Sequence, residues 1–260
     1  MYEQLKDIIL RAAGIVRSAA EADLGVREKT GPRDLVTKYD MLVQEFLKKE
    51  LLSLLPQAGF LGEEGASHPD PAACEWCFIV DPIDGTTNFV QGFHNSCVSV
   101  GLMHRGRMEY GLICNPYDGE LYTAQRGKGA FLNGKPIRAR DRELSRSLLI
   151  FGSALYYREL MGQTLDIFRA AFPLVQDIRR FGSAALDLCY LAAGKAGVFY
   201  DCRLSPWDYA AGSLIAEEAG CRVTQLDGSP LVFDRKCSVL AGSPQAYDAL
   251  AALIKKEVLA

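Results

Sequence analysis

The chain has 260 residues, of which 49% are hydrophobic, and this length suffices to bury a substantial core. Its 29 lysine and arginine residues nearly balance 32 aspartate and glutamate residues, giving a net charge of −3. Such a balance supplies no broad positive field, so nucleic acid is a disfavoured partner. No stretch reaches the ~20 apolar residues of a membrane span, and the first residues lack the pattern of a secretory signal. We therefore expect a cytoplasmic protein without a membrane partner.

Eight cysteines and three histidines limit the redox and zinc chemistry of the chain. Most cysteines stand singly among apolar neighbours, which is typical of buried thiols in a reducing compartment. Cys74 and Cys77 have the spacing of a redox or zinc half-site, but no second Cys/His pair stands at ligand spacing. We expect no disulfide framework, and we expect His68, His94 and His104 at the surface or in loops rather than in a zinc site or a Ser/His/Asp triad.

Two amphipathic helices are predicted at the start of the chain. Apolar residues recur at three- and four-residue steps over residues 5–19, which predicts a helix that ends before Gly25. Thr37 and Asp40 have the spacing of a capping box, so a second helix is expected to begin there and to end near Pro56.

Short strand-like runs follow the second helix, with tight turns at residues 104–107 and 115–119. The runs cover residues 78–80, 97–103, 108–114 and 120–124. Consecutive strands joined by tight turns favour an antiparallel meander over the strand-helix alternation of a parallel sheet.

The second half of the chain alternates helices with strands. Helices are predicted at residues 183–193, 208–219 and 246–255, and strands at 198–200 and 222–224. The fold class is therefore α+β with layered helices and sheets. We expect an α+β half over residues 1–145 and an α/β half over residues 146–260, with a packed junction between them because no Ser/Pro-rich linker separates them.

The most informative segment covers residues 78–89, where an apolar run leads into a glycine-containing turn. Asp81 and Asp84 stand at the end of this run, three residues apart, and Pro82 restricts the turn between them. Carboxylates and backbone carbonyls are the hard oxygen ligands that Mg²⁺ prefers. The pattern indicates a site for a divalent cation.

The residues after this pair suit an anion. Gly85 permits close approach of the backbone to a ligand, and the N–H groups and hydroxyls of Thr86 and Thr87 are placed to receive phosphate oxygens at a helix start. The alternative is that Asp-Pro and Asp-Gly merely form turns and that Thr86 caps a helix.

Other acidic segments carry the same two interpretations. Glu63 and Glu64 follow a short apolar run between glycines, where a solvated charged loop is the alternative to a cation site. Asp208 falls in the first turn of a helix, which a capping box with proline at its first position explains without a metal. Asp34 and Asp40 flank the start of the second helix, and Asp40 has a cap role as its alternative.

The acidic segments at residues 60–65, 81–88 and 207–212, in this order and spacing, resemble the three signature regions of the inositol monophosphatase family. The resemblance extends to residues 34–40, 127–134 and 182–188, and so runs over nearly the whole chain. It implies a five-layer αβαβα sandwich, a homodimer, and a phosphatase activity that needs Mg²⁺ and is inhibited by lithium.

The resemblance also implies roles for individual residues. Two or three Mg²⁺ ions would be bound by Glu63, Asp81, Asp84, Asp208 and the carbonyl of Ile83. The catalytic residues would be Thr86 and Asp40, which orient and help to deprotonate the attacking water, together with Glu63. The substrate contacts would come from Ile83, Asp84, Gly85, Thr86, Gly182, Ser183, Ala184, Asp201 and Asp208. Lys29 matches a lysine near the entrance and the most weakly held metal, ahead of a segment at residues 30–33 that we expect to be mobile.

The expected reaction is hydrolysis of an inositol monophosphate or a similar small polyol phosphate by metal-activated water, without a covalent phosphoenzyme. Asp201 departs from the glutamate that inositol-specific members often carry, so its carboxylate is one methylene shorter. Histidinol phosphate, fructose 1,6-bisphosphate and 3′-phosphoadenosine nucleotides stay open as substrates. Arg179 and Arg180 offer a contact to a second anionic group, with simple exposure as the alternative.

An alternative of another class is a partner of RNA or of a transcription complex, with incidental phosphatase activity. The balanced charge disfavours direct RNA contact. The complete acidic set, Glu63, Asp81, Asp84 and Asp208, favours retained catalysis.

Overall fold

The computed structural model describes residues 1–19, 24–31, 34–65, 70–153, 155 and 157–258, and its first two helices are those that the sequence predicts. α1 covers Tyr2–Ser18 and α2 covers Lys38–Leu54. The Thr37 hydroxyl accepts a hydrogen bond from the Tyr39 amide at 3.1 Å, and the predicted capping box with Asp40 is present. The apolar stripes of both helices are buried against the first sheet.

The predicted meander is confirmed within a sheet of seven strands in the order β3-β4-β5-β6-β7-β8-β9. Its strands are β3 (Gly59–Gly62), β4 (Trp76–Asp84), β5 (Cys97–His104), β6 (Arg107–Asn115), β7 (Glu120–Gln125), β8 (Ala130–Leu132) and β9 (Lys135–Ile137). All pairs from β4 to β9 are antiparallel, whereas β3 pairs with β4 in parallel. β3, β8 and β9, which have three or four residues each, were not predicted from the sequence.

The second sheet has five strands in the order β11-β10-β12-β14-β13. They are β10 (Leu148–Phe151), β11 (Asp177–Arg179), β12 (Val198–Leu204), β13 (Arg222–Thr224) and β14 (Cys237–Gly242). β10, β11 and β12 run parallel to one another, and β14 lies antiparallel between β12 and β13.

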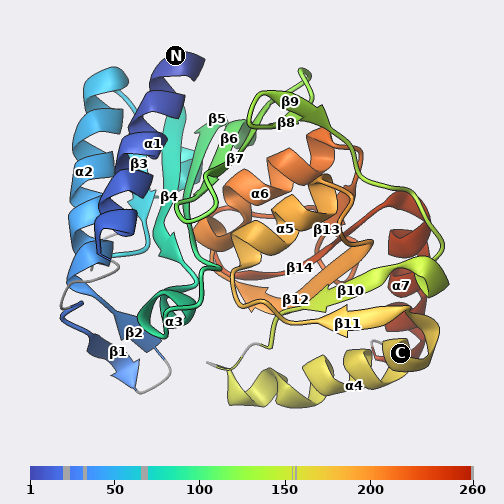
Figure 1. Cartoon of the computed structure of the whole chain (residues 1–260). Helices are drawn as coiled ribbons and strands as arrows, with labels where there is room; N and C mark the ends of the chain where they lie inside the picture. Colours follow the sequence, from blue (N-terminus) through green and yellow to red (C-terminus); the bar gives the residue numbers. More distant parts are fainter. Residues whose placement is uncertain (20–23, 32–33, 66–69, 154, 156, 259–260) are drawn as a thin grey trace.

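Helices on both sides of this sheet complete a five-layer αβαβα sandwich, so the expected fold is confirmed (Figure 1). The middle layer is α5 (Ala184–Ala192) and α6 (Pro206–Glu218), and the outer layer is α4 (Met161–Ala171) and α7 (Pro244–Glu257). Smaller elements are the hairpin of β1 (Arg27–Gly31) and β2 (Asp34–Val36), the short helix α3 (Thr86–Val90), and single 3₁₀ turns at Pro71–Ala73, Leu144–Arg146, Arg158–Leu160 and Phe172–Leu174. Pro32 and Arg33 of the segment expected to be mobile lie outside the described residues.

Each of the four interfaces between layers has its own buried apolar cluster. α6 contributes to both clusters of the middle layer, and almost its whole length from Tyr209 to Ala216 is buried. A helix that lies between two sheets needs apolar residues all round rather than on one stripe. The division into halves at residues 145 and 146 stays a prediction.

The cysteines and the two described histidines lie in ordinary packing environments. The eight cysteines are free, and all except Cys74 are buried. His94 is exposed and stacks on Tyr117, with ring centroids 4.4 Å apart, whereas the half-buried His104 stacks on Trp76 at 4.0 Å. His68 lies outside the described residues. In the described part of the chain, none of the helices combines the length and apolarity needed to cross a bilayer.

The close approach of α6 to the first sheet gives a testable prediction. A Cβ atom added at Gly111 in β6 would lie 2.6 Å from the Ala211 carbonyl oxygen, whereas one added at Gly14 in α1 would meet nothing within 4 Å. We expect Gly111→Ala to lower the free energy of unfolding by about 1–3 kcal/mol. Gly14→Ala should raise it by about 0.5–1 kcal/mol because alanine is the better helix former. Urea unfolding checks both, and an unchanged midpoint for Gly111→Ala would contradict the packing described here.

Candidate metal centre

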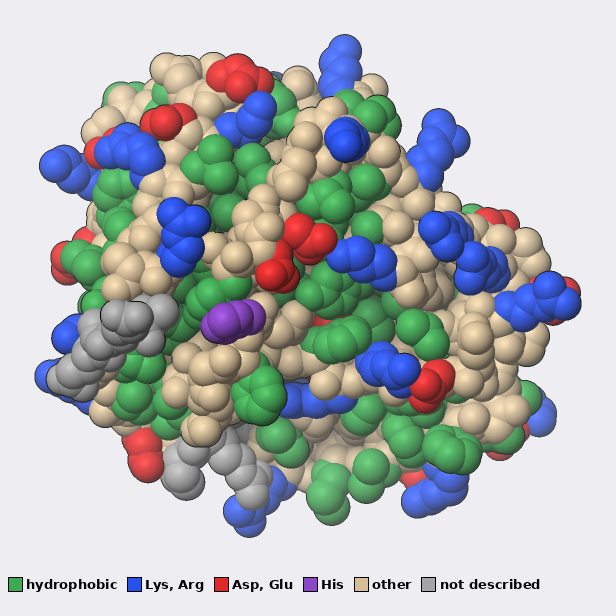
Figure 2. Space-filling view, in the orientation of Figure 1, with side chains coloured by type: hydrophobic (Ala, Val, Ile, Leu, Met, Phe, Trp, Pro, Cys, Tyr) green, Lys and Arg blue, Asp and Glu red, His purple; other side chains and the backbone are tan. Residues whose placement is uncertain are grey.

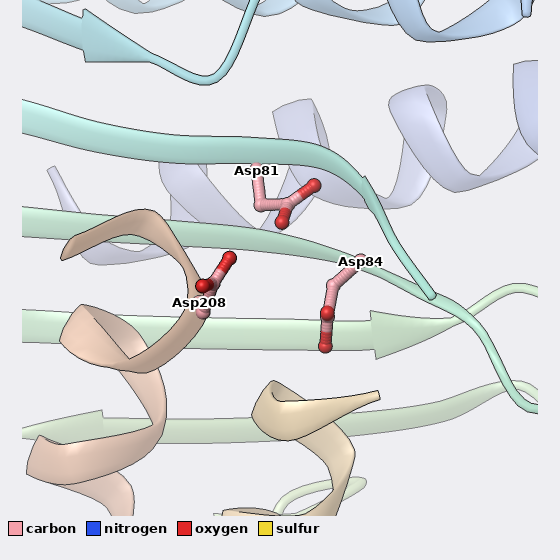
Figure 3. A group of neighbouring side chains, drawn as sticks. All are labelled: Asp81, Asp84 and Asp208. Atoms are coloured by element: carbon pink, nitrogen blue, oxygen red, sulfur yellow. The ribbon is translucent and has the colours of Figure 1, made fainter. Parts of the chain in front are cut away.

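Three aspartates from distant parts of the chain meet at one place. Asp81 and Asp84 come from the carboxyl-terminal end of β4, and Asp208 comes from the first turn of α6. One carboxylate oxygen from each lies within 4.8 Å of the others, and Figure 3 shows the three side chains grouped at one place. Asp81 is 2% exposed and Asp84 is 8% exposed, so two of the three carboxylates are buried.

Each aspartate is held through one of its two oxygens. Asp81 Oδ1 accepts a hydrogen bond from the Ile83 amide at 3.0 Å, and Asp208 Oδ2 accepts one from the Ser205 amide at 2.7 Å. The second bond belongs to a capping box, so the cap role considered for Asp208 is real. It uses a single oxygen, however, and Asp208 Oδ1 accepts no hydrogen bond from the described residues.

Asp84 is anchored in the same one-sided way by the start of α5. Its Oδ2 atom accepts hydrogen bonds from the Ser183 hydroxyl at 2.5 Å and from the Ala185 amide at 2.8 Å. Its Oδ1 atom, like Asp81 Oδ2, has no hydrogen-bond donor among the described residues. The three anchored carboxylates therefore present oxygens without donors to a shared centre, and a hard divalent cation prefers such oxygens.

Burial disfavours the charged forms of these three carboxylates. It raises the pKa of Asp84 to about 6, against which the Ser183 hydrogen bond acts. Burial first, and then the neighbouring carboxylates, raise the pKa values of Asp81 and Asp208 well above their usual range. A bound cation would favour the charged forms and reverse these shifts.

Glu63 lies beside the cluster because β3 pairs with β4. The Glu63 amide donates to the Val80 carbonyl at 3.2 Å, which holds Glu63 beside the end of β4. Lys29 Nζ lies 2.8 Å from Glu63 Oε1 and 2.5 Å from Glu64 Oε1. Burial raises the pKa of Glu63, and the charge of Lys29 opposes that rise. Lys29 thus lies next to the carboxylate cluster, where the family resemblance places a lysine.

Gln44, which was not predicted from the sequence, fixes the Glu63–Glu64 turn. Gln44 Oε1 accepts a hydrogen bond from the Glu64 amide at 2.8 Å, and its Nε2 atom donates to the Glu64 carbonyl. The available signal was a polar residue on the buried face of α2, between Val43 and Leu47.

Asp40 and Thr86 form a second polar pair beside the carboxylates. Asp40 is fully buried, and its Oδ2 atom accepts hydrogen bonds from the Thr37 amide at 2.7 Å and hydroxyl at 2.6 Å. Its Oδ1 atom lies 3.4 Å from Thr86 Oγ1, which also donates to the Ile83 carbonyl at 3.0 Å. Burial raises the pKa of Asp40. Asp40 therefore caps α2 through Oδ2 and accepts a hydrogen bond from the Thr86 hydroxyl at Oδ1.

The turn after Asp84 is tightly fitted to its surroundings. Gly85 has a φ of +88°, and an added Cβ atom would lie 3.1 Å from the carbonyl oxygens of both Asn95 and Gly182. Asn88, to which the sequence analysis gave no role, donates from Nδ2 to the Asn95 carbonyl at 2.8 Å and to the Phe181 carbonyl at 2.7 Å. These contacts join the turn of the first half to the start of α5.

Asp201 lies on β12 of the second sheet and is buried. Its Oδ1 atom accepts a hydrogen bond from the Arg203 amide at 2.8 Å, and burial raises its pKa to about 7. An added Cβ atom at Gly152 would lie 1.6 Å from Asp201 Oδ2, so only glycine leaves room for this carboxylate. Asp187, which the sequence analysis missed as a buried acid, has an Oδ1 atom without a hydrogen-bond partner in the described structure.

The other residues expected at the substrate end gather at the start of α5. Ser183 is the N-cap of α5 and Ala184 its first residue, with Gly182 just before them. The Ser183 hydroxyl is already used by Asp84, so the role it has in the structure is to orient a cluster carboxylate. Arg179 is exposed and forms an ion pair with Asp177. Arg180 lies beside Gly182, where an added Cβ atom would be 3.1 Å from Arg180 Nη1.

Comparisons by sequence and by structure find similar known proteins. A family model described as the inositol monophosphatase family matches residues 1–259. The Nus factor SuhB of Pseudomonas aeruginosa is 34% identical over 97% of this chain and 96% of its own length. The inositol-1-monophosphatase of Mesorhizobium japonicum is 40% identical over 88% of this chain and 86% of its own. The crystal structure of the extragenic suppressor protein suhB from Bartonella henselae superposes with a TM-score of 0.91 at 34% identity, covering 99% of both chains.

The raised carboxylate pKa values predict how cation binding and pH act together on stability. The pKa of Asp84 lies above its unfolded value, so the metal-free fold binds extra protons and loses stability as pH rises from about 4 through about 6. A divalent cation competes with those protons. We expect saturating Mg²⁺ or Mn²⁺ to raise Tm by about 5 °C or more near pH 8, and by clearly less near pH 5.5.

Two variants distinguish cation binding at the cluster from a general effect of salt on Tm. Asp84→Asn should raise the Tm of the chelator-treated protein near pH 8 and reduce the Tm gain on adding cation. Asp166→Asn, which changes an exposed carboxylate on α4, should keep the gain of the unchanged protein. An equal gain in both variants would contradict cation binding at the cluster.

Proposed function

Since the chain belongs to the inositol monophosphatase family, we propose that it is a Mg²⁺-dependent phosphomonoesterase acting on an inositol monophosphate or a similar small polyol phosphate. One observation carries this proposal: three anchored aspartates present oxygens without hydrogen-bond donors to one centre, beside the Asp40–Thr86 pair. A phosphatase needs positive charge to offset an anionic substrate and a group to manage the proton of the attacking water.

The donor set fits Mg²⁺. Its members are all oxygens, from the side chains of Glu63, Asp81, Asp84 and Asp208 and from the carbonyl of Ile83. When bound, two or three such ions would offset the charge of the phosphate and lower the pKa of a water molecule. The chain's own part is to hold these oxygens in place through the amides of Ile83, Ala185 and Ser205.

Asp40 and Thr86 are suited to move the proton of the attacking water. The Thr86 hydroxyl has one hydrogen and two acceptors in reach, Asp40 Oδ1 at 3.4 Å and the Ile83 carbonyl at 3.0 Å. When that hydrogen points to Asp40, Thr86 Oγ1 is free to accept a hydrogen bond from water. Burial raises the pKa of Asp40, which favours acceptance of a proton at Oδ1.

The polyol end of the substrate would lie near Asp201 and the start of α5. The Asp201 Oδ2 atom accepts no hydrogen bond from the described residues, so it is available to a sugar hydroxyl. Because aspartate is shorter than glutamate, the proposal includes histidinol phosphate, fructose 1,6-bisphosphate and 3′-phosphoadenosine 5′-phosphate as competing substrates.

A second candidate function comes from the names of the relatives. Several curated relatives, including that of Pseudomonas aeruginosa, are named Nus factor SuhB. A role as a partner of a transcription complex is therefore the alternative, with phosphatase activity beside it. Homodimer formation and lithium inhibition stay predictions from the resemblance.

Phosphate release from a substrate panel tests the proposal. The panel is inositol 1-phosphate, histidinol phosphate, fructose 1,6-bisphosphate and 3′-phosphoadenosine 5′-phosphate, each with Mg²⁺ and with chelator. We expect Mg²⁺-dependent turnover that is fastest on inositol 1-phosphate. A different best substrate would change the assigned substrate and keep the chemistry, whereas no turnover on the whole panel would favour the transcription partner.

Two variants at Thr86 test the proton role. Thr86→Ala removes the hydroxyl and should lower kcat by about 10²–10⁴-fold, while the cation-induced rise in Tm persists. Thr86→Ser keeps the hydroxyl and should stay within about tenfold of the unchanged protein, because the proton path is retained. Equal activity of the alanine and serine variants would remove Thr86 from the mechanism.

A further inference from the structure

An arginine-rich surface lies on the connection between β9 and β10, far along the chain from the carboxylate cluster. Two adjoining cavities open there. The larger, of about 530 Å³, is lined by Arg142, Ser145, Arg146 and Gln176. The smaller, of about 170 Å³, shares Arg142, Arg146 and Gln176 and adds Arg140, Ser147, Leu148 and residues 194–197. We call this combined surface the arginine groove.

The arginines of the groove have no acidic partner in the described structure. Elsewhere, eight arginines form ion pairs with carboxylates: Arg11, Arg105, Arg126, Arg169, Arg179, Arg203, Arg222 and Arg235. Arg140, Arg142 and Arg146 are exposed and, within the described residues, form neither an ion pair nor a side-chain hydrogen bond. Three neighbouring guanidinium groups thus keep their full hydrogen-bonding capacity.

Of the two acidic residues nearest in sequence, Asp141 is engaged at α7, whereas Glu143 contacts a lining residue of the larger cavity. Asp141 accepts hydrogen bonds from the Gln245 amide at 2.9 Å and from its side chain at 3.1 Å, at the start of α7. Glu143 accepts one from the Ser145 hydroxyl at 3.4 Å. Lys195, on the rim of the smaller cavity, is paired with Glu120 at 3.0 Å. Within the described residues neither Asp141 nor Glu143 forms an ion pair with an arginine of the groove, and the lining itself contains no carboxylate.

The topology separates the groove from the carboxylate cluster. β10, β11 and β12 are parallel, and the groove residues Leu148, Gln176 and Gly197 stand at or just before their amino-terminal ends. Gly152, Arg180 and Asp201 stand near the opposite ends, which face the cluster. Blue side chains gather on the right-hand side in Figure 2, the side on which the β9–β10 connection runs in Figure 1.

The chemistry of the lining selects the kind of ligand. Guanidinium groups bind phosphate oxygens with paired hydrogen bonds, and several together favour more than one phosphate. Among the described residues that line the groove there is no aromatic side chain on which a base would stack. The cavity size suits a small molecule rather than a long strand.

We propose that the arginine groove binds a small anion that carries two or more phosphate groups. Inorganic polyphosphate and a doubly phosphorylated sugar share this chemistry. The site is independent of the proposed phosphatase reaction, because none of its lining residues belongs to the carboxylate cluster.

Calorimetric titration of the full chain with inorganic tripolyphosphate, and separately with fructose 1,6-bisphosphate, tests this site. Chelator is present throughout, so that cations at the cluster do not recruit the phosphates. The groove variant carries Arg140→Gln, Arg142→Gln and Arg146→Gln. The control carries Arg17→Gln, Arg107→Gln and Arg158→Gln, three exposed arginines that lack ion pairs among the described residues and whose loss changes the net charge equally.

We expect at least one of the two anions to bind, with Kd raised tenfold or more in the groove variant and less than twofold in the control. Arg142→Gln alone, which affects both cavities, should weaken binding several-fold and guards against misfolding of the triple variant. If only one of the two anions binds, the result shows whether the ligand is an inorganic polyphosphate or a phosphorylated sugar. The proposal is overturned by absence of binding, by equal weakening in the groove variant and the control, or by groove-dependent binding of a single-stranded RNA alone.

Discussion

The burial of several like-charged carboxylates at the end of β4 is the constraint on which the rest of the site depends. In each of the three aspartates, one carboxylate oxygen accepts a hydrogen bond, and the other has no hydrogen-bond donor among the described residues. The donors come from the β4 turn and from the starts of α5 and α6, the two helices of the middle layer (Figures 1 and 3). The amino-terminal end of a helix carries partial positive charge, which favours a nearby carboxylate. The middle layer thus fixes the cluster and also supplies part of its compensating charge.

Protein groups compensate the cluster only partly. Among the described residues, Lys29 is the cation that ion-pairs with its edge, and it contacts Glu63 and Glu64 rather than the three aspartates. The pKa values of Asp81, Asp84 and Asp208 accordingly rise. A cation is the most direct way to satisfy the oxygens that have no donor. The groove has the opposite character, because its guanidinium groups form no ion pair with a carboxylate in the part of the chain that the structure describes. The arginine groove therefore lies at one end of the parallel strands, and the other end faces the carboxylate cluster of β4 and α6.

The sequence predicted the parts of the fold that have strong local signals. The capping boxes at Thr37 and Ser205, the long apolar runs of β5 and β6 and the helices of the middle layer were found because each depends on neighbouring residues. β10, β11 and β14 were missed because strands of only three to six residues carry too short a pattern to distinguish a strand from part of a helix or a loop. The cap and cation interpretations of Asp208 could not be separated from sequence, because they do not exclude each other: the cap uses only Oδ2. Gln44 and Asp187 were missed because their importance comes from contacts between distant segments.

Anomalous diffraction from crystals soaked in Mn²⁺ tests the central claim most directly, because Mn²⁺ replaces Mg²⁺ at oxygen sites and its anomalous signal locates each ion. We expect a peak within coordination distance of the free oxygens of Asp81, Asp84 and Asp208, with a further peak beside Glu63 accompanied by movement of Lys29 away from that carboxylate. Crystals of Asp84→Asn should lose the peak among the aspartates. A fully soaked crystal of the unchanged protein without a peak among the three aspartates would contradict the account.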